Sequence, residues 1–464
     1  MRRTAKTSSS WASAIERGDK PAYLAIADAI AADIDTGALT ANQRLPTLRV
    51  LARELDLNFT TVARAYAEAR RRGLIDARPR IGTVVRGVAA DVPLAANIDM
   101  TMNMPPEPRE PALLARLEQG LFAGLRGGDP YATLRYQEFG GSVRDRDAGA
   151  QWLAPSLPGV DGRQVLACPG MQGALLALFA VLAAPGETIA CEAITYPGIQ
   201  GIAAQLGIRL AGLPLDHEGL EAQAFEALCV ARQPKALYCN PTLNNPTTLT
   251  WSRQRRATIA AIAQRYGVMI IEDDAYARLP TTPVASLASL APERTFYLSG
   301  LAKCMGAGLR IAYLVPPSQR YAARVAAALR TMAVMAPAPS LAIATRWIGD
   351  GTAEAILQAV RGESHQRQRL AARILRRAEY AAHPDGFHLW LKVPEPWSRA
   401  GFTEYLRASG IGVVASDAFV VGIQAPEAVR ICLGGPMSRV ECGHWLEIIE
   451  DTVGQMPALT SRVM

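Results

Sequence analysis

The chain has 464 residues, half of them hydrophobic, which is too long for one small domain and predicts about three folded units. Its net charge of +7 is unevenly distributed. Residues 1–88 hold 15 Lys/Arg and 9 Asp/Glu, a net +6, and the rest hold 34 and 33, a net +1. A basic segment on a near-neutral body indicates a polyanionic partner for that segment, although a solvated arginine-rich surface would give the same charge.

The cysteines and histidines indicate whether the chain has disulfide bonds or a metal site. The seven cysteines form no C-x-x-C pair and predict buried free thiols in a reducing compartment, and the five scattered histidines predict no metal site. The first ten residues are not followed by the apolar core of a secretory signal. The longest apolar stretch, around Met171 to Pro185, is too short to span a bilayer, so we expect a cytoplasmic protein.

The first 88 residues are predicted to form three helices and a two-stranded hairpin, at 20–37, 48–55, 60–72 and 74–85. Thr47 can cap the second helix because its hydroxyl can accept an exposed amide. The third helix carries an inward face of Val62, Ala65, Tyr66 and Ala69 at helical spacing. Helix, helix, turn, helix and hairpin make a winged helix-turn-helix.

The residue types in this unit are those that bind DNA phosphates and base edges. The third helix offers hydroxyls and amides at its start to phosphates or base edges, and arginines can reach phosphates or guanine edges. These candidate contacts are Arg49, Thr60, Thr61 and Arg64, with Arg78 and Arg80 flanking the wing tip. A helical domain with a solvated basic face is the alternative, but element order, charge and wing together favour DNA.

Specific motifs in this unit resemble the DNA-binding domain of GntR-family regulators over residues 20–86. They are Arg44-Leu-Pro-Thr-Leu-Arg49-Val-Leu-Ala, Thr61-Val, Gly73-Leu-Ile and Gly82-Thr-Val-Val. The resemblance implies that Arg49, Thr60, Thr61 and Gly82 lie at or near DNA.

After the first unit, the Pro- and Ala-rich residues 89–110 predict a linker with an extended end. From 111 onward apolar strands alternate with helices, which predicts an α/β body with a mostly parallel central sheet. The strands are expected at 164–167, 188–191, 236–239, 268–272, 295–298 and 311–315. From about 355 a long Arg-rich helix and a new strand predict a smaller α+β subdomain that continues to 464.

Polar groups fall at the predicted strand ends, where open α/β sheets bind ligands. Lys303 lies between a strand and a Gly-rich turn, with Arg310 seven residues on, which suits a Schiff base to pyridoxal phosphate (PLP). The amides of Gly170, Met171 and Gln172 begin an apolar helix and can hold a phosphate. An amide in the 244–248 turn can donate to the phenolic oxygen of PLP, and a carboxylate from 272–274 can face its ring nitrogen. Individually these are ordinary βα, Asn-Pro and acidic turns.

The order Asn, Asp, Lys, Arg over successive strand ends resembles fold-type I aminotransferases, over roughly 110–464. The resemblance implies that Lys303 forms the aldimine and that Asp273 faces the pyridine nitrogen. It places Asn245 and Tyr276 at the ring oxygen, Arg310 at the phosphate and Tyr196 against the ring. It makes Tyr136 a residue lent to the partner subunit's phosphate, and Arg430 the fork that grips a substrate carboxylate. The motif departs from the family at Gly300, where a hydroxyl is usual, and Ser299 is the adjacent substitute; Ala302 and Thr248 also differ.

A GntR-type winged helix joined to an aminotransferase-like body resembles the MocR subgroup of bacterial regulators. That resemblance implies a PLP-dependent transcription regulator that binds operator DNA, senses PLP or an amino compound, and forms a head-to-tail homodimer. Two alternatives remain open at this point. One is a working amino acid aminotransferase with a DNA-binding domain. The other is a regulator in which PLP is purely structural.

Overall fold

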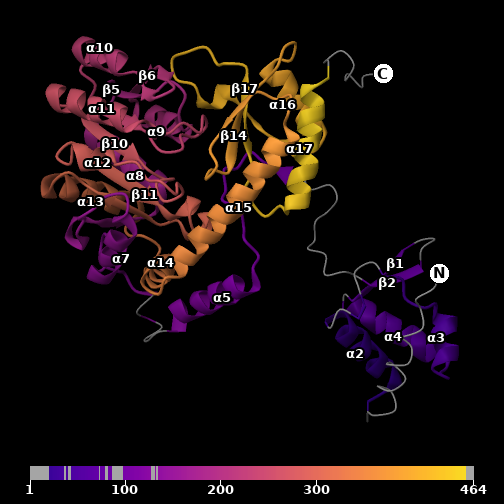
Figure 1. The fold of residues 1–464 in the computed structure, drawn as a ribbon. Helices are drawn as coiled ribbons and strands as arrows, with labels where there is room; N and C mark the ends of the chain where they lie inside the picture. Colours follow the sequence, from indigo (N-terminus) through magenta and orange to yellow (C-terminus); the bar gives the residue numbers. More distant parts are fainter. Residues whose placement is uncertain are drawn as a thin grey trace. The chain divides into compact units, whose positions relative to one another are not determined.

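The computed structural model describes residues 20–35, 38–39, 43–72, 74–78, 82–85, 98–126, 131 and 134–455. The chain divides into two compact units, Met1–Ala96 and Asn97–Met464 (Figure 1). Within the described residues no helix has the length and apolarity needed to cross a membrane. All seven cysteines are buried and free, as the sequence predicted.

The first unit is the predicted winged helix-turn-helix. Its elements are α2 (Ala22–Asp35), α3 (Leu48–Glu54), α4 (Phe59–Arg71), β1 (Ile75–Arg78) and β2 (Gly82–Val85). Thr47 caps α3 by accepting from the Val50 amide, and β1 and β2 pair antiparallel with Ile75 opposite Val85. The predicted inward face of α4 is buried in one apolar core with α2 and α3. Gly37, at the end of the first predicted helix, and Gly73, just after the third, lie outside the described residues.

The second unit is built on a seven-stranded sheet in the order β4-β12-β11-β10-β9-β5-β6. The strands are β4 (Leu166–Cys168), β5 (Thr188–Glu192), β6 (Arg209–Leu213), β9 (Ala236–Cys239), β10 (Met269–Asp273), β11 (Thr295–Gly300) and β12 (Ala312–Val315). Strands β6, β5, β9, β10 and β11 run parallel, and β12 runs antiparallel to both of its neighbours. The predicted mostly parallel α/β sheet is therefore confirmed.

Helices cover both faces of this sheet (Figure 1). One face packs against α8 (Gly170–Leu182), α9 (Gly198–Leu206) and α13 (Gln319–Ala333). The other packs against α10 (Ala222–Arg232), α11 (Arg253–Tyr266) and α12 (Leu287–Leu290). A further core joins α5 (Pro111–Arg126), α7 (Val143–Leu153), α14 (Ala338–Gly349) and α15 (Thr352–Ile374) to the C-terminal part of the chain.

The C-terminal part is the expected smaller α+β subdomain. Its sheet has the order β13-β14-β17-β16 and is flanked by two helices. The elements are β13 (Tyr380–Ala382), β14 (His388–Lys392), α16 (Arg399–Ala408), β15 (Ile411–Gly412), β16 (Val414–Ala415), β17 (Ala428–Cys432) and α17 (Arg439–Val453).

The boundary between the units differs from the linker expected at 89–110. Residues Ile98–Asp99 form β3, which pairs in parallel with β15, and Pro106 bridges to Gly435. Met100 is fully buried in the core of the second unit. Backbone pairing and burial therefore place residues 98–110 in the second unit, despite their Pro-rich composition.

Candidate functional site

The parallel strands β9, β10 and β11 end at one edge of the sheet and bring the predicted site residues there. Asp273 is the last residue of β10, Lys303 follows β11, and the loop with Asn245 follows β9. Adjacent parallel strands release their chains at the same edge, so residues distant in sequence converge. This edge is the candidate site.

Lys303 differs from the other described lysines. Lys20, Lys235 and Lys392 have side chains that are 69%, 49% and 67% exposed and that pair with carboxylates. Lys303 is partly buried, and its Nζ lies 5.9 Å from the ring centroid of Tyr276. Burial, mainly, lowers its pKa to about 8, because a desolvated ammonium loses the hydration that favours the charged form. Its Nζ donates to the main-chain oxygen of Asn103.

Of the two carboxyl oxygens of Asp273, one accepts a hydrogen bond and the other has no donor among the described residues. Its Oδ2 accepts a hydrogen bond from the Tyr238 hydroxyl at 2.7 Å. Its Oδ1 is buried and has no partner among the described residues. Burial raises the pKa of this carboxyl to about 6, and the Tyr238 hydrogen bond opposes that rise. A buried acceptor without a donor is costly, so the position suits a ligand that brings one.

Arg430 and Asn245 contact each other directly. The Nη1 of Arg430 donates to Asn245 Oδ1 at 2.7 Å, and its Nη2 donates to the main-chain oxygen of Thr101. The guanidinium carbon lies 5.1 Å from the ring centroid of Phe419. Only 5% of Arg430 is exposed, so its charge is held inside the protein, next to the amide expected at the ring oxygen.

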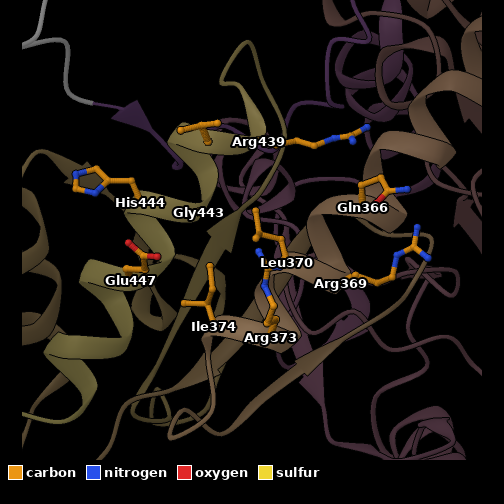
Figure 2. A pocket seen from close by; sticks show the side chains of 10 residues that line it. Gln366, Arg369, Leu370, Arg373, Ile374, Arg439, Gly443, His444 and Glu447 are labelled. Carbon is orange, nitrogen blue, oxygen red and sulfur yellow. The ribbon is translucent and has the colours of Figure 1, made fainter.

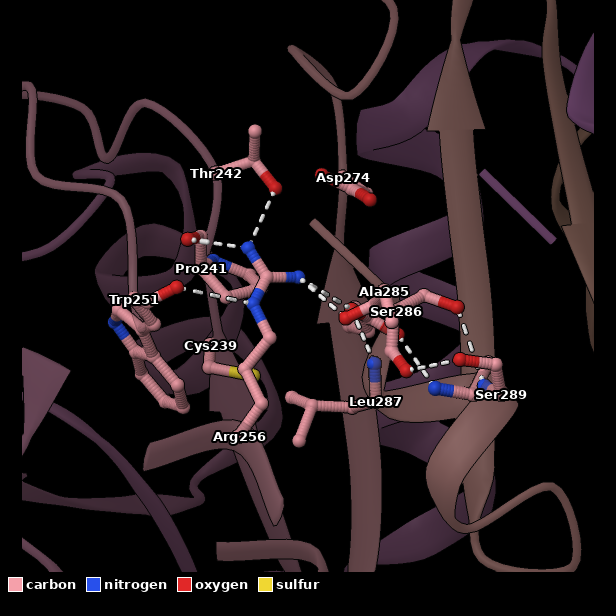
Figure 3. Close-up of polar contacts among 12 residues, drawn as sticks. Cys239, Pro241, Thr242, Trp251, Arg256, Asp274, Ala285, Ser286, Leu287 and Ser289 are labelled. Carbon is pink, nitrogen blue, oxygen red and sulfur yellow. Dashed lines mark hydrogen bonds and ion pairs between the residues drawn. The ribbon is translucent and has the colours of Figure 1, made fainter. Parts of the chain in front are cut away.

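The loop that carries Asn245 is anchored by a buried arginine (Figure 3). Arg256 donates to the main-chain oxygens of Trp251 and Pro241 and to the Thr242 hydroxyl, at 3.3, 2.9 and 3.0 Å. It also forms an ion pair with Glu272 at 3.5 Å, and neither side chain is exposed. Arg256 therefore joins the Asn245 loop to β10, the strand that ends in Asp273.

Asn240 links the same two positions from the strand side. Its Nδ2 donates to the main-chain oxygen of Asp273 at 2.6 Å, and its Oδ1 accepts from the Asn245 amide at 2.9 Å. Its own amide donates to the buried carboxylate of Glu192 at 3.2 Å. The relative position of Asp273 and Asn245 is thus fixed by hydrogen bonds.

The predicted phosphate residues converge at the start of α8. Gly170 has a φ of +77°, and a Cβ there would lie 3.3 Å from Arg310 Nη2, so its lack of a side chain permits this approach. Arg310 itself takes a left-handed φ of +52°. Gln172, in the same turn, accepts from the Tyr196 hydroxyl at 3.0 Å.

Ser299 is not brought to this turn. Successive strand residues face opposite sides, so Ser299 lies on the face of β11 opposite to Leu298, which packs with α8. Its neighbour Gly300 does face α8, and a Cβ there would lie 2.6 Å from Met171 Cγ. Met171 therefore explains the missing hydroxyl at 300, and the expected substitution by Ser299 is corrected.

Tyr136 lies apart from these groups. Its side chain is 85% exposed, next to Leu134, which is 74% exposed. Within one chain the structure does not bring it to Lys303.

A surface pocket of about 880 Å³ lies elsewhere, between α15 and α17 (Figure 2). Arg369, Arg373, Arg439, His444 and Glu447 are among its lining residues. None of the predicted cofactor or DNA residues lines it.

Some of the residues expected to contact DNA are exposed on the first unit. Arg49 and Arg64 are exposed, and the Arg64 guanidinium carbon lies 4.5 Å from the Tyr23 ring centroid. The amides of Thr60 and Thr61 are not available as expected, since both donate to Asn58, at 2.9 and 3.0 Å.

The wing contacts are only partly described. Gly82 has a φ of +100°, and a Cβ there would lie 3.2 Å from Arg44 Nε, so glycine suits this strand start. Arg78 ends β1, although its side chain is not described, and Arg80 lies outside the described residues.

Sequence reasoning missed Asn103, Tyr238, Asn240 and Arg256. Tyr238 and Asn240 lie at the end of a strand that was correctly predicted, so position at the sheet edge was an available signal. Asn103 lies in the presumed linker, and Arg256 on an ordinary helix, where no local pattern marked them.

Two known families match the chain, one in each of its two compact units. Residues 115–449 match the family described as aminotransferase class I and II, and residues 22–85 match the bacterial regulatory proteins of the gntR family.

Curated relatives share both parts. The chain is 29% identical over 448 residues to the uncharacterized HTH-type transcriptional regulator YdeF of Bacillus subtilis, covering 95% of this chain and 96% of that protein. It is 26% identical to the vitamin B6 salvage pathway transcriptional repressor PtsJ of Salmonella typhimurium, covering 88% and 93%. It is also 26% identical to the probable rhizopine catabolism regulatory protein MocR of Rhizobium meliloti, covering 65% and 66%.

Among solved structures, the chain resembles the α-aminoadipate aminotransferase LysN of Thermus thermophilus, which was determined with N-(5'-phosphopyridoxyl)-L-leucine. The TM-score is 0.70 at 21% identity, covering 78% of this chain and 93% of that one. The kynurenine aminotransferase of Pyrococcus horikoshii gives a TM-score of 0.70 at 19% identity, covering 78% and 91%. These likenesses show the fold.

Proposed function

The chain belongs to the class I and II aminotransferase family and joins that body to a GntR-type domain, and from this premise we propose that a ligand bound at Lys303 controls its binding to DNA. It is a GntR-type transcription regulator with an aminotransferase-like body, and PLP is its cofactor. Control requires that the ligand bind two conformations with different affinity, since equal affinity would shift nothing.

The residues at the sheet edge fit PLP. When bound, PLP supplies an aldehyde that condenses with an amine and a ring that accepts electrons. Lys303 would be the amine, and the unpartnered Asp273 Oδ1 could accept from the ring nitrogen. Asn245 and Tyr276 would hold the ring oxygen, and Tyr196 would support the ring.

The start of α8 would hold the phosphate. The amides of Gly170, Met171 and Gln172 would bind it together with Arg310, because a helix N-terminus and a cation both favour an anion. The close approach of Arg310 to Gly170 supports this assignment.

The observation that carries the proposal is Lys303. It is the one described lysine that is withdrawn from solvent and unpaired with a carboxylate, and its pKa is lowered to about 8. A neutral amine is the form that attacks an aldehyde, so a lowered pKa prepares this residue for the cofactor.

The effector is PLP itself or an amino compound with an acid group. Arg430 is buried beside Asn245 and supplies a fork that a carboxylate can grip through two hydrogen bonds. PtsJ, named for vitamin B6 salvage, supports a PLP-related signal, and MocR, named for rhizopine catabolism, supports a small metabolite.

DNA binding is assigned to the first unit, through Arg49, Arg64 and the wing. The helix order, the buried α4 face and the net +6 charge of residues 1–88 support it. The exposed Tyr136 and Leu134 favour a homodimer, in which Tyr136 reaches the partner's site.

The test follows the visible absorbance of bound PLP and binding to a DNA duplex. Purified protein mixed with PLP should gain the absorbance, and Lys303→Ala should abolish it. Lys235→Ala is the matched control, since Lys235 is exposed and paired with Glu187. Absorbance retained in Lys303→Ala would refute the assignment, and duplex binding by the wild type that is the same with and without PLP would refute the control of DNA binding.

A further inference from the structure

Residues 100–104, here called the strap, cross the candidate site and contact its two cations. Lys303 donates to the main-chain oxygen of Asn103, and Arg430 donates to that of Thr101. The side chain of Asn103 donates from Nδ2 to the Tyr276 hydroxyl at 2.9 Å. Three residues assigned to the cofactor or effector are therefore engaged by one short segment.

The strap is held from its other side by the small subdomain. The amide of Cys432 donates to the Met100 oxygen at 3.2 Å, and that of Gly435 donates to the Pro105 oxygen at 3.0 Å. The approach is so close at Gly434 that a Cβ there would lie 1.6 Å from the Met104 oxygen. The strap is thus bound both to the site residues and to residues 432–435.

Ligands would compete with the strap for the same donors. A carboxylate carries the opposite charge to Arg430 and can accept two parallel hydrogen bonds from its guanidinium, so it displaces the neutral Thr101 oxygen. A Lys303 nitrogen bonded to the cofactor no longer carries the ammonium that donates to Asn103. Bonding of Lys303 to the cofactor therefore removes its contact with Asn103, and a bound carboxylate removes the contact of Arg430 with Thr101.

We propose that release of the strap is the step by which occupancy of the Lys303–Arg430 site is passed toward the first unit. This inference rests on the proposed function. The strap directly follows β3, at the start of the second unit, so a change at Thr101 and Asn103 occurs at the part of that unit nearest in sequence to the first. The signal is the loss of the Asn103 contact when PLP bonds to Lys303, and of the Thr101 contact when a carboxylate binds Arg430.

Hydrogen exchange of the full-length protein, read by mass spectrometry, tests the proposal. The peptides of interest cover residues 98–106 and 428–436, which hold the Met104, Cys432 and Gly435 amides. Adding PLP to the cofactor-free protein should make exchange in them about tenfold faster or more, the effect of losing roughly 1.4 kcal/mol of local stability. Unchanged or slower exchange would overturn the proposal.

Two variants test whether bonding of Lys303 to the cofactor is the cause of the faster exchange. Lys303→Arg keeps a cation at 303 but cannot bond to the cofactor aldehyde, so PLP should leave exchange in these peptides slow. Met102→Ala is the control within the strap, because its side chain is 57% exposed, and it should respond to PLP as the wild type does. Faster exchange on adding PLP to Lys303→Arg would also overturn the proposal.

Absorbance recorded on the same samples distinguishes a failure of the strap proposal from a failure of the proposed function. If the visible absorbance of bound PLP forms and exchange does not accelerate, the strap proposal fails and the proposed function stands. If no absorbance forms in the wild type, the proposed function fails and the strap proposal fails with it.

Discussion

Lys303 should react with PLP at a pH where an ordinary lysine is almost fully protonated. Burial lowers its pKa from 10.5 to about 8, nearby Arg430 and Arg310 lower it too, and Cys432 and Asp273 act in the opposite direction. At pH 7 an amine with a pKa of about 8 is roughly 10% neutral, against roughly 0.03% for an unperturbed lysine. The structure thus gives Lys303 about a 300-fold larger neutral fraction.

The direction of the pH dependence follows from the form of Lys303 that reacts. Only the neutral amine attacks, so the rate of PLP incorporation should rise with pH, reach half its maximum near 8 and level off above it. Arg430→Gln removes a positive charge that lowers this pKa, and the midpoint should move up. The assay mixes cofactor-free protein with PLP in a stopped-flow instrument and follows the visible absorbance at each pH. A wild-type midpoint near 10, or one that ignores the Arg430 charge, would refute the reasoning.

Three further outcomes are expected. Arg256→Met leaves Glu272 buried without its partner and should lower the free energy of unfolding by about 3–5 kcal/mol in urea titrations, and a loss below about 1 kcal/mol would count against it. Arg430→Ala should retain PLP absorbance but bind amino acid effectors about 1.5–3 kcal/mol more weakly in spectral titrations, whereas an unchanged affinity would mean the ligand is held elsewhere. Arg49→Ala should weaken duplex binding measured by fluorescence anisotropy by about 1–3 kcal/mol if it reads a base, and full-length affinity that ignores both salt and this change would contradict the DNA assignment.

The fold was predictable because each signal is local. The α4 face repeats at helical spacing, Thr47 precedes an apolar helix, and the strands of the large sheet are short apolar runs between helices. The convergence of Asp273, Lys303 and the Asn245 loop follows from parallel strands that end at one edge.

The strap and the buried anchors were not predictable, because their partners are distant in sequence. The Lys303–Asn103 contact joins residues 200 positions apart, and the Arg430–Thr101 contact joins residues 329 apart. Proline-rich composition predicted a linker with an extended end at 89–110, but composition does not distinguish a linker from a segment that packs against a core. Ser299 was misplaced for a related reason, since side chains alternate along β11 and its neighbour Gly300 is the residue that faces α8.

Borohydride reduction followed by peptide mapping tests the central claim most directly. Reduction fixes PLP to the lysine that holds it, and the chain offers only five lysines. The account predicts one modified tryptic peptide, spanning 295–310, because trypsin does not cleave at a modified Lys303. Modification at Lys235 or Lys392 instead, or no modification of PLP-treated protein, would contradict it.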